Sequence, residues 1–402
     1  MNNTITQHMI LDRKYHFLFF GLTSFDSLPQ REQALAAECA RSGHRVDFIE
    51  IAPSLAGRSH ALFNRVFAPL SRDTGFTRDS THPNLRVHTP PMLPTGFRNS
   101  LTPGIDRILF QQWFQHRFSK IDFSHSIVMV MMPLWWNNFI NRTLVNPYLL
   151  VYDVSDALEV QSRSDATMRR LLASEASLGQ EADLITYSAA EMDADLQLRF
   201  PDTRRLFLPN AVSSEMIARI EITSPHKRNG QRPSLGYIGA TCGKWFDKEL
   251  MLAVADSFPE CEIEIIGPVD TSYKEACARR SNIRLHGYVS HERLPDHLQR
   301  FDIALIPFFS NEITRVVNPL KLYEYSAAGL PVVAIRSAEL EQYASLLYLA
   351  DGRQGFIDGI RRASHEDTLV LRKNRRAFAE RNTWRHRVAT LIEYLHPQVL
   401  SV

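Results

Sequence analysis

The chain has 402 residues, of which 44% are hydrophobic and 22% are charged. This length predicts two or three domains, and this composition is that of a soluble globular protein. The formal net charge of only +2 argues against a general polyanion binder, so no nucleic-acid partner is expected. The four cysteines lack CxxC or other metal spacing, and residues 1–16 lack a signal-peptide core. Both features indicate reduced thiols and a cytoplasmic location.

The first half of the chain alternates between strand and helix patterns. An apolar strand at residues 17–20 leads through Gly21 into a helix at about residues 30–42, and a second strand follows at residues 45–51. Strand, loop, helix and strand in this order form a βαβ unit, which implies a parallel sheet. We therefore predict a first Rossmann-like domain over residues 14–218. Its further strands are expected at residues 85–88, 127–131, 148–152, 184–187 and 205–208.

A polar segment with Pro and Gly at residues 220–233 has the composition of a linker, and the same alternation then restarts. It predicts a second Rossmann-like domain over residues 233–370. A helical tail is expected at residues 371–402, with its charged helix starting near residue 369 and crossing back to the first domain. The predicted fold class is α/β, with two doubly wound domains facing a cleft. The strands of the second domain are expected at residues 235–238, 261–266, 283–286, 303–306 and 332–335.

The helix expected at about residues 318–329 has clear signals at both ends. Asn318 suits the N-cap, Pro319 suits the first turn, and Gly329 suits the left-handed conformation that ends a helix. Lys321 and Glu324 lie three residues apart and therefore share one face. A helix N-terminus with a lysine can bind a diphosphate, and a carboxylate one turn further in can accept hydrogen bonds from a ribose diol. The alternative is an ordinary ion pair on a solvated face.

Ligands of open α/β sheets bind where the strands end at their carboxyl sides. In the second domain these ends carry two glycine-containing loops, at Gly239 and Gly267. The spacing of the glycines is not that of the dinucleotide fingerprint, and no Walker lysine follows them. This pattern argues against dehydrogenases and P-loop NTPases. The last strand end before the capped helix carries a dense polar set, formed by Asn311, Glu312, Thr314 and Arg315.

Several short sequence words occur in a fixed order along nearly the whole chain. Those of the first domain are REQALAAECARSGHRV (31–46), VYDVSD (151–156), EADLITYSA (181–189) and LPNAV (208–212). Those of the second are GYIGA (236–240), WFDKEL (245–250), IEIIGP (263–268), NIRLHGYVSHERLPDHLQRFDIALIPF (282–308) and NPLKLYEYSAAGLPVV (318–333). With these words the chain resembles GT-B glycosyltransferases of the family 4-like group that builds bacterial exopolysaccharide and lipopolysaccharide. The resemblance implies a hexosyl- or glucuronosyl-transferase type of enzyme.

The resemblance also implies that the second domain binds the donor, a UDP- or GDP-linked sugar. It places Glu324 at the ribose hydroxyls, and the loops of Gly239, Gly267 and Tyr288 around the nucleotide. Many relatives carry a sugar-contacting glutamate eight residues before Glu324, where this chain has Val316. That contact is expected from Glu312 or Arg315 instead. Other residues expected at the donor are Thr314 and Asn318, with Lys321 and Arg315 stabilising the leaving diphosphate and no metal cofactor required.

The first domain is expected to bind a glycan or polyprenyl-linked acceptor near Gly21, Arg31 and Asp153. Some relatives without the paired glutamates are inverting glucuronosyltransferases, in which an acidic residue of the first domain serves as the base. Asp156 is therefore predicted as the general base, with Asp153 in reserve. Two alternatives stay open. In the first, Asp156 is not a base but caps a helix that starts at Ala157. In the second, Arg31 holds the glycine loop instead of contacting an acceptor phosphate.

Residues 55–72 and 105–120 combine basic and large apolar side chains at helical spacing. Such helices lie on anionic bilayers, which suits peripheral contact with the inner face of a membrane. Ordinary core helices explain the same pattern. Two other functions are open on this fold. One is a nucleotide-sugar epimerase or phosphorylase, and the other is a non-catalytic subunit that binds nucleotide sugars.

Overall fold

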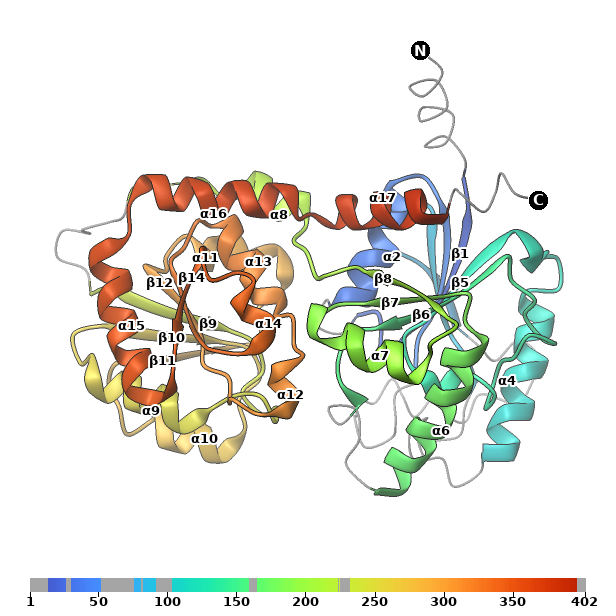
Figure 1. Cartoon of the computed structure of the whole chain (residues 1–402), viewed down its shortest axis with the longest axis horizontal. Coiled ribbons are helices and arrows are strands. Elements are labelled where there is room, and N and C mark those ends of the chain that lie inside the picture. The colour runs from blue at the N-terminus through green and yellow to red at the C-terminus, as the bar shows by residue number, and fades with distance from the viewer. Residues whose placement is uncertain are drawn as a thin grey trace, which may run out of the picture. The chain divides into compact units, whose positions relative to one another are not determined.

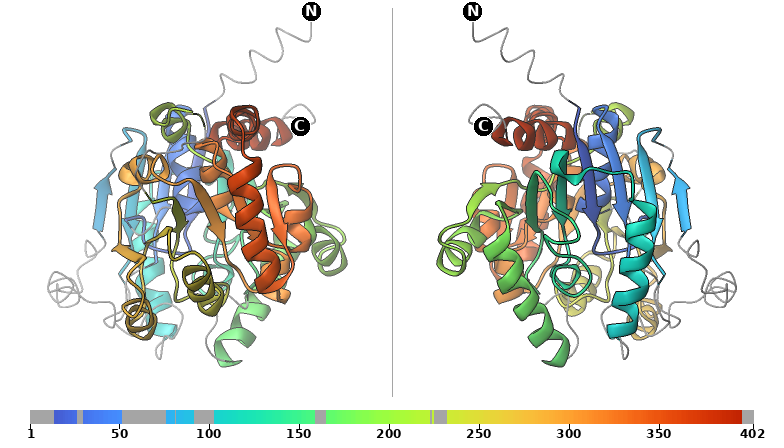
Figure 2. Two further views of the ribbon diagram at one scale, coloured as in Figure 1. Left: turned by 90° about the vertical axis from the view of Figure 1, so that its left-hand side faces the viewer. Right: turned by 90° about the vertical axis from the view of Figure 1, so that its right-hand side faces the viewer.

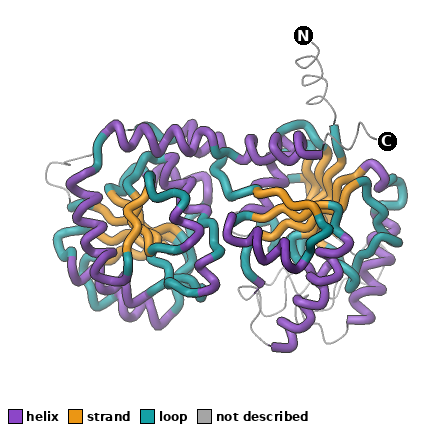
Figure 3. Tube along the Cα trace, in the orientation of Figure 1, coloured by secondary structure: helices purple, strands orange, loops and turns teal. Residues whose placement is uncertain are grey.

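The computed structural model describes residues 14–26, 30–51, 76–80, 82–91, 103–158, 165–222, 224 and 232–395. The chain divides into two compact units (Figure 1). The first unit is made of residues 1–188, 192–208 and 388–402, and the second of residues 189–191 and 209–387. In each unit a sheet lies among helices, as the orange strands of Figure 3 show. The predicted α/β architecture with two parallel-sheet domains is confirmed.

The first unit has an eight-stranded sheet in the order β3-β4-β2-β1-β5-β6-β7-β8. All neighbouring strands are parallel except β3, which pairs antiparallel with β4 at the sheet edge. Phe76–Asp79 is a short and mostly polar segment, and for this reason the sequence pattern does not predict β3. The strands are β1 (His16–Phe20), β2 (Arg45–Ile49), β3 (Phe76–Asp79), β4 (Leu85–Thr89), β5 (Ser126–Val130), β6 (Leu149–Val154), β7 (Leu184–Tyr187) and β8 (Arg204–Phe207).

The helices of this unit cover the sheet with aromatic and aliphatic side chains. Helix α4 buries Phe110 and Phe114, whose rings lie 5.5 Å from Trp135 and 6.3 Å from Phe20, respectively. Helices α4 (cyan) and α6 (green) can be followed in the right-hand view of Figure 2. The α-helices are α2 (Arg31–Arg41), α4 (Pro103–Arg117), α6 (Asp165–Glu181) and α7 (Asp193–Arg199), with 3-10 turns η3 (Phe123–His125) and η4 (Pro133–Trp135). A further turn, η5 (Ala190–Met192), has its first two residues in the second unit.

A row of polar side chains crosses the middle of this sheet. Asp47 of β2 is 1% exposed and lies 2.9 Å from His16 Nε2 and 2.7 Å from His88 Nε2. The other ring nitrogens of these histidines contact the hydroxyls of Ser126 and Thr77. The row therefore ties together the five strands β3, β4, β2, β1 and β5. Burial opposes ionisation of Asp47, but the contacts with His16 and His88 outweigh it and lower the pKa of Asp47 far below its usual value.

The second unit has a six-stranded sheet in the order β11-β10-β9-β12-β13-β14, and its neighbouring strands are all parallel. Helices α9, α10 and α15 pack on one face, and α8, α11, α13, α14 and α16 pack on the other. The strands are β9 (Ser234–Ile238), β10 (Glu262–Ile266), β11 (Ile283–Gly287), β12 (Ile303–Ile306), β13 (Val332–Ile335) and β14 (Leu347–Ala350). The helices are α8 (Ser214–Arg219), α9 (Lys248–Ser257), α10 (Thr271–Cys277), η6 (His291–Arg293), α11 (Leu294–Leu298), α12 (Glu312–Arg315), α13 (Leu320–Ala327), α14 (Ala338–Glu341), α15 (Gly352–Glu366) and α16 (Leu369–Arg381).

The C-terminal tail consists of two helices, not the single helix expected at residues 369–395. Helix α16 ends at Arg381, and α17 (Trp384–Leu395) ends within the first unit, as expected. The break occurs because the backbone at Asn382 and Trp384 pairs with Val212 through two hydrogen bonds of 3.1 Å, which a continuous helix would not leave free. No helix in the described part of the chain is long and apolar enough to cross a membrane.

Candidate functional site

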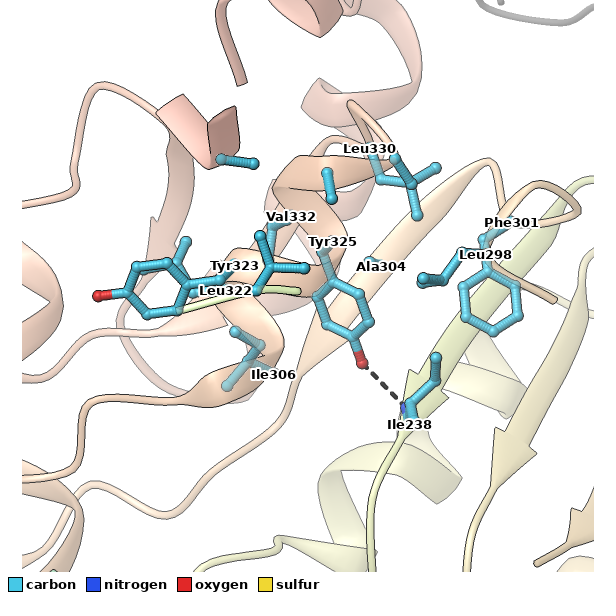
Figure 4. Close-up of a cluster of buried hydrophobic side chains, with 14 of the residues drawn as sticks. Ile238, Leu298, Phe301, Ala304, Ile306, Leu322, Tyr323, Tyr325, Leu330 and Val332 are labelled. Atoms are coloured by element: carbon cyan, nitrogen blue, oxygen red, sulfur yellow. Dashed lines mark hydrogen bonds between the residues drawn. The ribbon is translucent and has the colours of Figure 1, made fainter. Parts of the chain in front are cut away.

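Helix α13 is fixed against the sheet by a buried face (Figure 4). Leu322, Tyr323 and Tyr325 are all fully buried in the core that this helix shares with α11 and α16. The Tyr325 hydroxyl accepts a hydrogen bond of 2.9 Å from the backbone N–H of Ile238, the last residue of β9. The helix is therefore held in a fixed position at the carboxyl end of this strand.

The two ends of α13 differ in how well the sequence predicts them. The C-terminus is as expected, because Gly329 has a φ of 68° and its N–H donates to Ser326 O over 2.9 Å. The expected N-cap is wrong, because Pro319 occupies that position and helix α13 starts at Leu320. Asn318 is instead drawn into a buried cluster, where its side-chain N–H groups donate to Glu339 Oε1 over 2.8 Å and to the Tyr343 hydroxyl over 3.1 Å.

The buried cluster also includes Asn210, which belongs to the LPNAV sequence word at residues 208–212. The backbone N–H of Asn210 donates to Asn318 Oδ1 over 3.1 Å, and its side chain donates to Asn318 O over 2.6 Å. Both residues belong to the second unit. Burial raises the pKa of Glu339, which accepts from Asn318. Asn318 thus positions the start of α13, and sequence reasoning missed its partners because they lie far away in the chain.

Glu324 lies between the side chains of Lys321 and His291. Its Oε2 accepts from Lys321 Nζ over 2.7 Å, and its Oε1 lies 3.5 Å from His291 Nε2. Glu324 is only 1% exposed, so the pair does not lie on a solvated face, which was the alternative expected from the sequence. Burial by itself would raise the pKa of Glu324, but Lys321 and His291 outweigh it and lower the pKa to about 2. A buried carboxylate is therefore kept ionised.

His291 is a residue that sequence reasoning did not single out. It lies at the start of η6, on the segment that follows β11, and its side chain is about one-third exposed. Its contact with Glu324 shows that the chain after β11 meets α13 at this carboxylate. The signal in the sequence was weak, because a single histidine after a strand is most often unrelated to a site.

The loops of Gly239 and Gly267 approach each other closely. Gly239 N–H donates to Ile266 O, and Gly267 N–H donates to Gly287 O, each over 2.8 Å. Gly267 has a φ of 136°, and a Cβ atom there would lie 2.2 Å from Gly239 O. The two predicted glycines therefore lie together at the carboxyl ends of β9 and β10. Tyr288 follows β11 at the same edge and is 60% exposed.

The polar set before α13 forms the short helix α12. Asn311 caps this helix, and the Thr314 hydroxyl is used within the capping box, where Thr314 is 3% exposed. Arg315 is half-exposed and pairs with Glu312 over 3.1 Å and with Glu191 over 3.2 Å. Glu312 and Arg315 therefore remain open to a ligand, while Thr314 is buried in a structural role.

In the first unit the predicted acceptor-side residues surround the first loop of the sheet. Arg31 donates to both carboxylate oxygens of Asp153, with Nε over 2.9 Å and Nη2 over 2.8 Å, and both residues are buried. Thr186 donates to the same carboxylate over 2.6 Å. The Gly21 carbonyl accepts from Trp135 Nε1 over 2.8 Å. Arg31 and Asp153 are thus engaged with each other in a buried ion pair, and their expected roles toward an acceptor stay predictions.

Asp156 lies just beyond β6 and is half-buried. Burial raises its pKa to about 6, although the charge of Arg31 opposes this shift. A carboxyl group with this pKa is mostly ionised at neutral pH and still basic enough to accept a proton. Residues 159–164, over which a helix capped by Asp156 would run, lie outside the described residues. Residues 55–72 fall outside them too.

Glu32 and Glu50 hold the loop between β1 and α2, a role that sequence reasoning missed. Glu32 accepts from the backbone N–H groups of Leu22 and Thr23 and from the Thr23 hydroxyl. Burial raises the pKa of Glu32 to about 7 despite these bonds. Glu50 accepts from the backbone of Phe25 over 2.9 Å. The loop is therefore shaped by side chains that no local motif marks.

A family model and a curated relative both match part of this chain, and both describe glycosyltransferases. The family model described as "Glycosyl transferase-like" matches residues 245–393. A relative from Bacillus subtilis (strain 168), TuaH, is 27% identical over 202 residues, which is 46% of this chain and 49% of the relative. Its name describes it as a teichuronic acid biosynthesis glycosyltransferase. The match thus spans about half the length of this curated relative.

Solved structures resemble nearly the whole chain. Sucrose-phosphate synthase from Thermosynechococcus elongatus has a TM-score of 0.73 at 14% identity, covering 97% of this chain and 100% of that one. HepE of Anabaena, solved with UDP and glucose, has a TM-score of 0.64 at 14% identity, with coverages of 96% and 100%. WaaG, a glycosyltransferase involved in lipopolysaccharide biosynthesis, has a TM-score of 0.63 at 14% identity, with coverages of 94% and 99%.

These likenesses agree with the sequence words in both units. The fold is shared over the full length, and the family model covers most of the second unit, including the Glu324 site. The resemblance predicted from the sequence is therefore confirmed: the chain has the GT-B fold and is similar to glycosyltransferases of bacterial polysaccharide synthesis.

Proposed function

We propose that the chain is a glycosyltransferase that moves a sugar from a nucleoside-diphosphate sugar to a glycan or polyprenyl-linked acceptor in bacterial surface polysaccharide synthesis. The observation that carries this proposal is the buried, ionised carboxylate of Glu324 on α13, held between Lys321 and His291. A buried, ionised carboxylate with a shifted pKa, at the strand ends where open α/β sheets bind ligands, is a candidate for ligand binding.

The donor is bound by α13 and the loops at the carboxyl ends of β9, β10 and β11. Lys321 meets the diphosphate, and Glu324 accepts hydrogen bonds from the ribose hydroxyls. Gly239 and Gly267 allow the two loops to pack closely together at the strand ends where the nucleotide is proposed to bind. Tyr288 offers an exposed ring to a base at the same edge.

Transfer needs a base for the acceptor hydroxyl and positive charge at the leaving group. Asp156 is the proposed base, because its pKa of about 6 leaves it ionised at neutral pH. Lys321 and Arg315 are proposed to stabilise the diphosphate as its negative charge develops, with no metal required for the reaction. Attack assisted by such a base, without a covalent intermediate, inverts the configuration at the sugar.

The comparisons guide the choice of substrates. HepE is described in complex with UDP and glucose, and TuaH by its name acts in teichuronic acid biosynthesis. UDP-linked hexoses and UDP-glucuronic acid are therefore the first donors to test, followed by GDP-linked sugars. A lipid-linked acceptor would be met at the membrane surface. Helix α4 exposes Ile105 and Ile108 by 52% and 56%, while its aromatic residues Phe110, Trp113 and Phe114 are buried in the core.

The test combines donor binding with product analysis. Thermal shift with a panel of nucleotide sugars identifies the donor, because a ligand at 100 times its Kd adds roughly 2.7 kcal/mol to stability. Mass spectrometry then follows that donor with polyprenyl-phosphate and polyprenyl-diphosphate-sugar acceptors. Transfer predicts one added sugar on the acceptor and one free nucleoside diphosphate. Conversion of the donor without an acceptor would indicate an epimerase, and binding without turnover on any acceptor would indicate a non-catalytic subunit.

A further inference from the structure

A second group of ligand-type side chains lies in the second unit, away from Glu324. Glu264 of β10, His286 of β11 and His297 of α11 each place one ligand atom within 4.8 Å of the other two. Glu264 and His297 are both 6% exposed, and the His286 side chain is 25% exposed. The three come from two neighbouring strands and from the helix that packs over them, so the fold itself assembles the cluster.

One atom of this cluster lacks a partner that the fold would normally supply. His286 Nε2 is buried and makes no hydrogen bond among the described residues, although it lies 3.0 Å from Glu264 Oε2. A buried ring nitrogen without a hydrogen bond costs free energy. Glu264 Oε1, by contrast, accepts from the Ser234 hydroxyl over 2.7 Å, which fixes the direction of the carboxylate.

From this geometry we propose that Glu264, His286 and His297 form a site for a transition-metal ion of the zinc type. Two histidines and one glutamate are a ligand set that zinc uses in proteins, with the fourth position left to water. Bonds of about 2.0–2.1 Å in a tetrahedral site place the ligand atoms about 3.3 Å apart. The 3.0 Å separation of Glu264 and His286 is close to this spacing, and the ligand atom of His297 lies within 4.8 Å of both. The ion would supply the partner that His286 Nε2 lacks.

The surroundings of His297 agree with this assignment. Arg300 donates to His297 Nδ1 over 2.7 Å, so this nitrogen presents its lone pair, and a metal ion bound there would replace Arg300. Arg300 is exposed and can move away into solvent. The Ser234 contact with Glu264 is the type of supporting bond that orients a metal ligand.

The site would be a structural metal site. It would join α11 to the edge strand β11 and to β10, and α11 continues directly from η6, where His291 contacts Glu324. The proposed ion takes no part in sugar transfer. Metal binding by the free protein therefore does not depend on the proposed function.

The experiment is metal titration of the purified chain, freed of metal by a chelator. We expect one Zn²⁺ per chain by isothermal titration, and one Co²⁺ with the intense visible absorption of a tetrahedral complex. His286→Gln and His297→Gln should each weaken Zn²⁺ binding by at least about tenfold and remove the tetrahedral Co²⁺ spectrum. His365→Gln, which changes an exposed histidine on α15, is the matched control and should bind as the unaltered chain does.

A thermal melt without metal shows whether each variant is folded. If His286→Gln fails to fold, the conservative Glu264→Gln provides the same test. The proposal is overturned if the unaltered chain binds no Zn²⁺, or if folded variants of the cluster bind Zn²⁺ with the same Kd. It is also overturned if His365→Gln is the variant that loses the metal, because the ion would then lie elsewhere.

Discussion

Lys321 lies one turn before Glu324 and is proposed to bind the diphosphate of the donor. In the free protein it pairs with Glu324, and its side chain is 21% exposed, so its Nζ can turn toward a ligand. We predict that Lys321→Gln weakens the binding of a nucleoside diphosphate by about tenfold, while binding of the free nucleoside changes less than about twofold. Isothermal titration with both ligands measures this difference. Lys373→Gln, which changes an exposed lysine on α16, is the control. Equal weakening of both ligands would leave Lys321 with a structural role only.

Asp156 carries the prediction for the chemical step. Its pKa is raised to about 6, so the carboxylate needed as a base is lost as the pH falls through that value. We expect kcat to fall about tenfold per pH unit below this pKa. Asp156→Asn should lower kcat by roughly a hundredfold and remove this pH dependence, with donor Kd within about twofold.

The product of the reaction provides the second check on Asp156. From an α-linked donor, NMR should show a β-linked product, because direct attack inverts the configuration. An α-linked product, or near-normal turnover in Asp156→Asn, would contradict the assignment of Asp156 as the base.

At the level of elements, the turns after β9 and β10 depend on Gly267. Its φ of 136° and the 2.2 Å that would separate an added Cβ atom from Gly239 O leave no room for a side chain. We predict that Gly267→Ala destabilises the protein by at least about 2 kcal/mol and also weakens donor binding. Gly355→Ala is the matched control, because its Cβ would lie 3.8 Å from the nearest atom outside helix α15. This control should be neutral or slightly stabilising by urea denaturation. Equal stability of both variants would contradict the close approach.

Helix α13 shows which parts of an element can be predicted from sequence. Its C-terminus is predictable because Gly329 and Pro331 act through their own backbone restrictions. Its N-terminus is not, because Asn318 binds Asn210 and Glu339, and no local pattern reports partners so far away in the chain. The same reason applies to the break before α17, where Asn382 and Trp384 pair with Val212. Local chemistry can be read from the sequence, and distant pairing cannot.

The residues of the candidate site also fall into those that can be predicted from local sequence and those that cannot. The Lys321–Glu324 pair follows from helical spacing, and the two glycines from their places at strand ends. His291, Glu32 and Glu339 are missed because isolated polar residues give no signal until the fold brings them to a partner. An acceptor role for Arg31 and Asp153 stays a prediction, since the structure shows their buried ion pair.

At the scale of a whole unit, the polar row through Asp47 makes the first sheet sensitive to acid. The pKa of Asp47 is lowered in the folded state, so its stabilising contribution is present above its unfolded value, about 3.9, and is lost as the pH falls below it. Burial also lowers the pKa of His88 in the folded state. The unfolded chain therefore binds a proton at this histidine more readily, and the fold loses stability as the pH falls below about 6.5, the usual histidine value.

We therefore predict that Asp47→Asn destabilises the chain by about 3 kcal/mol at neutral pH, because the buried His88 and the partly buried His16 lose their charged partner. The difference from the unaltered chain should shrink as the pH falls toward about 3, below the unfolded pKa of an aspartate. Thermal melts across this range of pH measure it. The exposed Asp358→Asn is the control. A loss of stability that is the same at every pH would contradict the role given to the Asp47 charge.

For the molecule as a whole, the central claim is that the second unit binds a nucleotide-sugar donor at Glu324. Isothermal titration of the free nucleoside diphosphate and of its sugar, with the unaltered chain and with Glu324→Gln, tests it most directly. Loss of a charged hydrogen-bond acceptor costs about 1.5–3 kcal/mol, so Kd should rise roughly ten- to hundredfold. Glu366→Gln, at the exposed end of α15, should bind as the unaltered chain does. An unchanged Kd in folded Glu324→Gln, or no binding of any nucleotide by the unaltered chain, would contradict the claim.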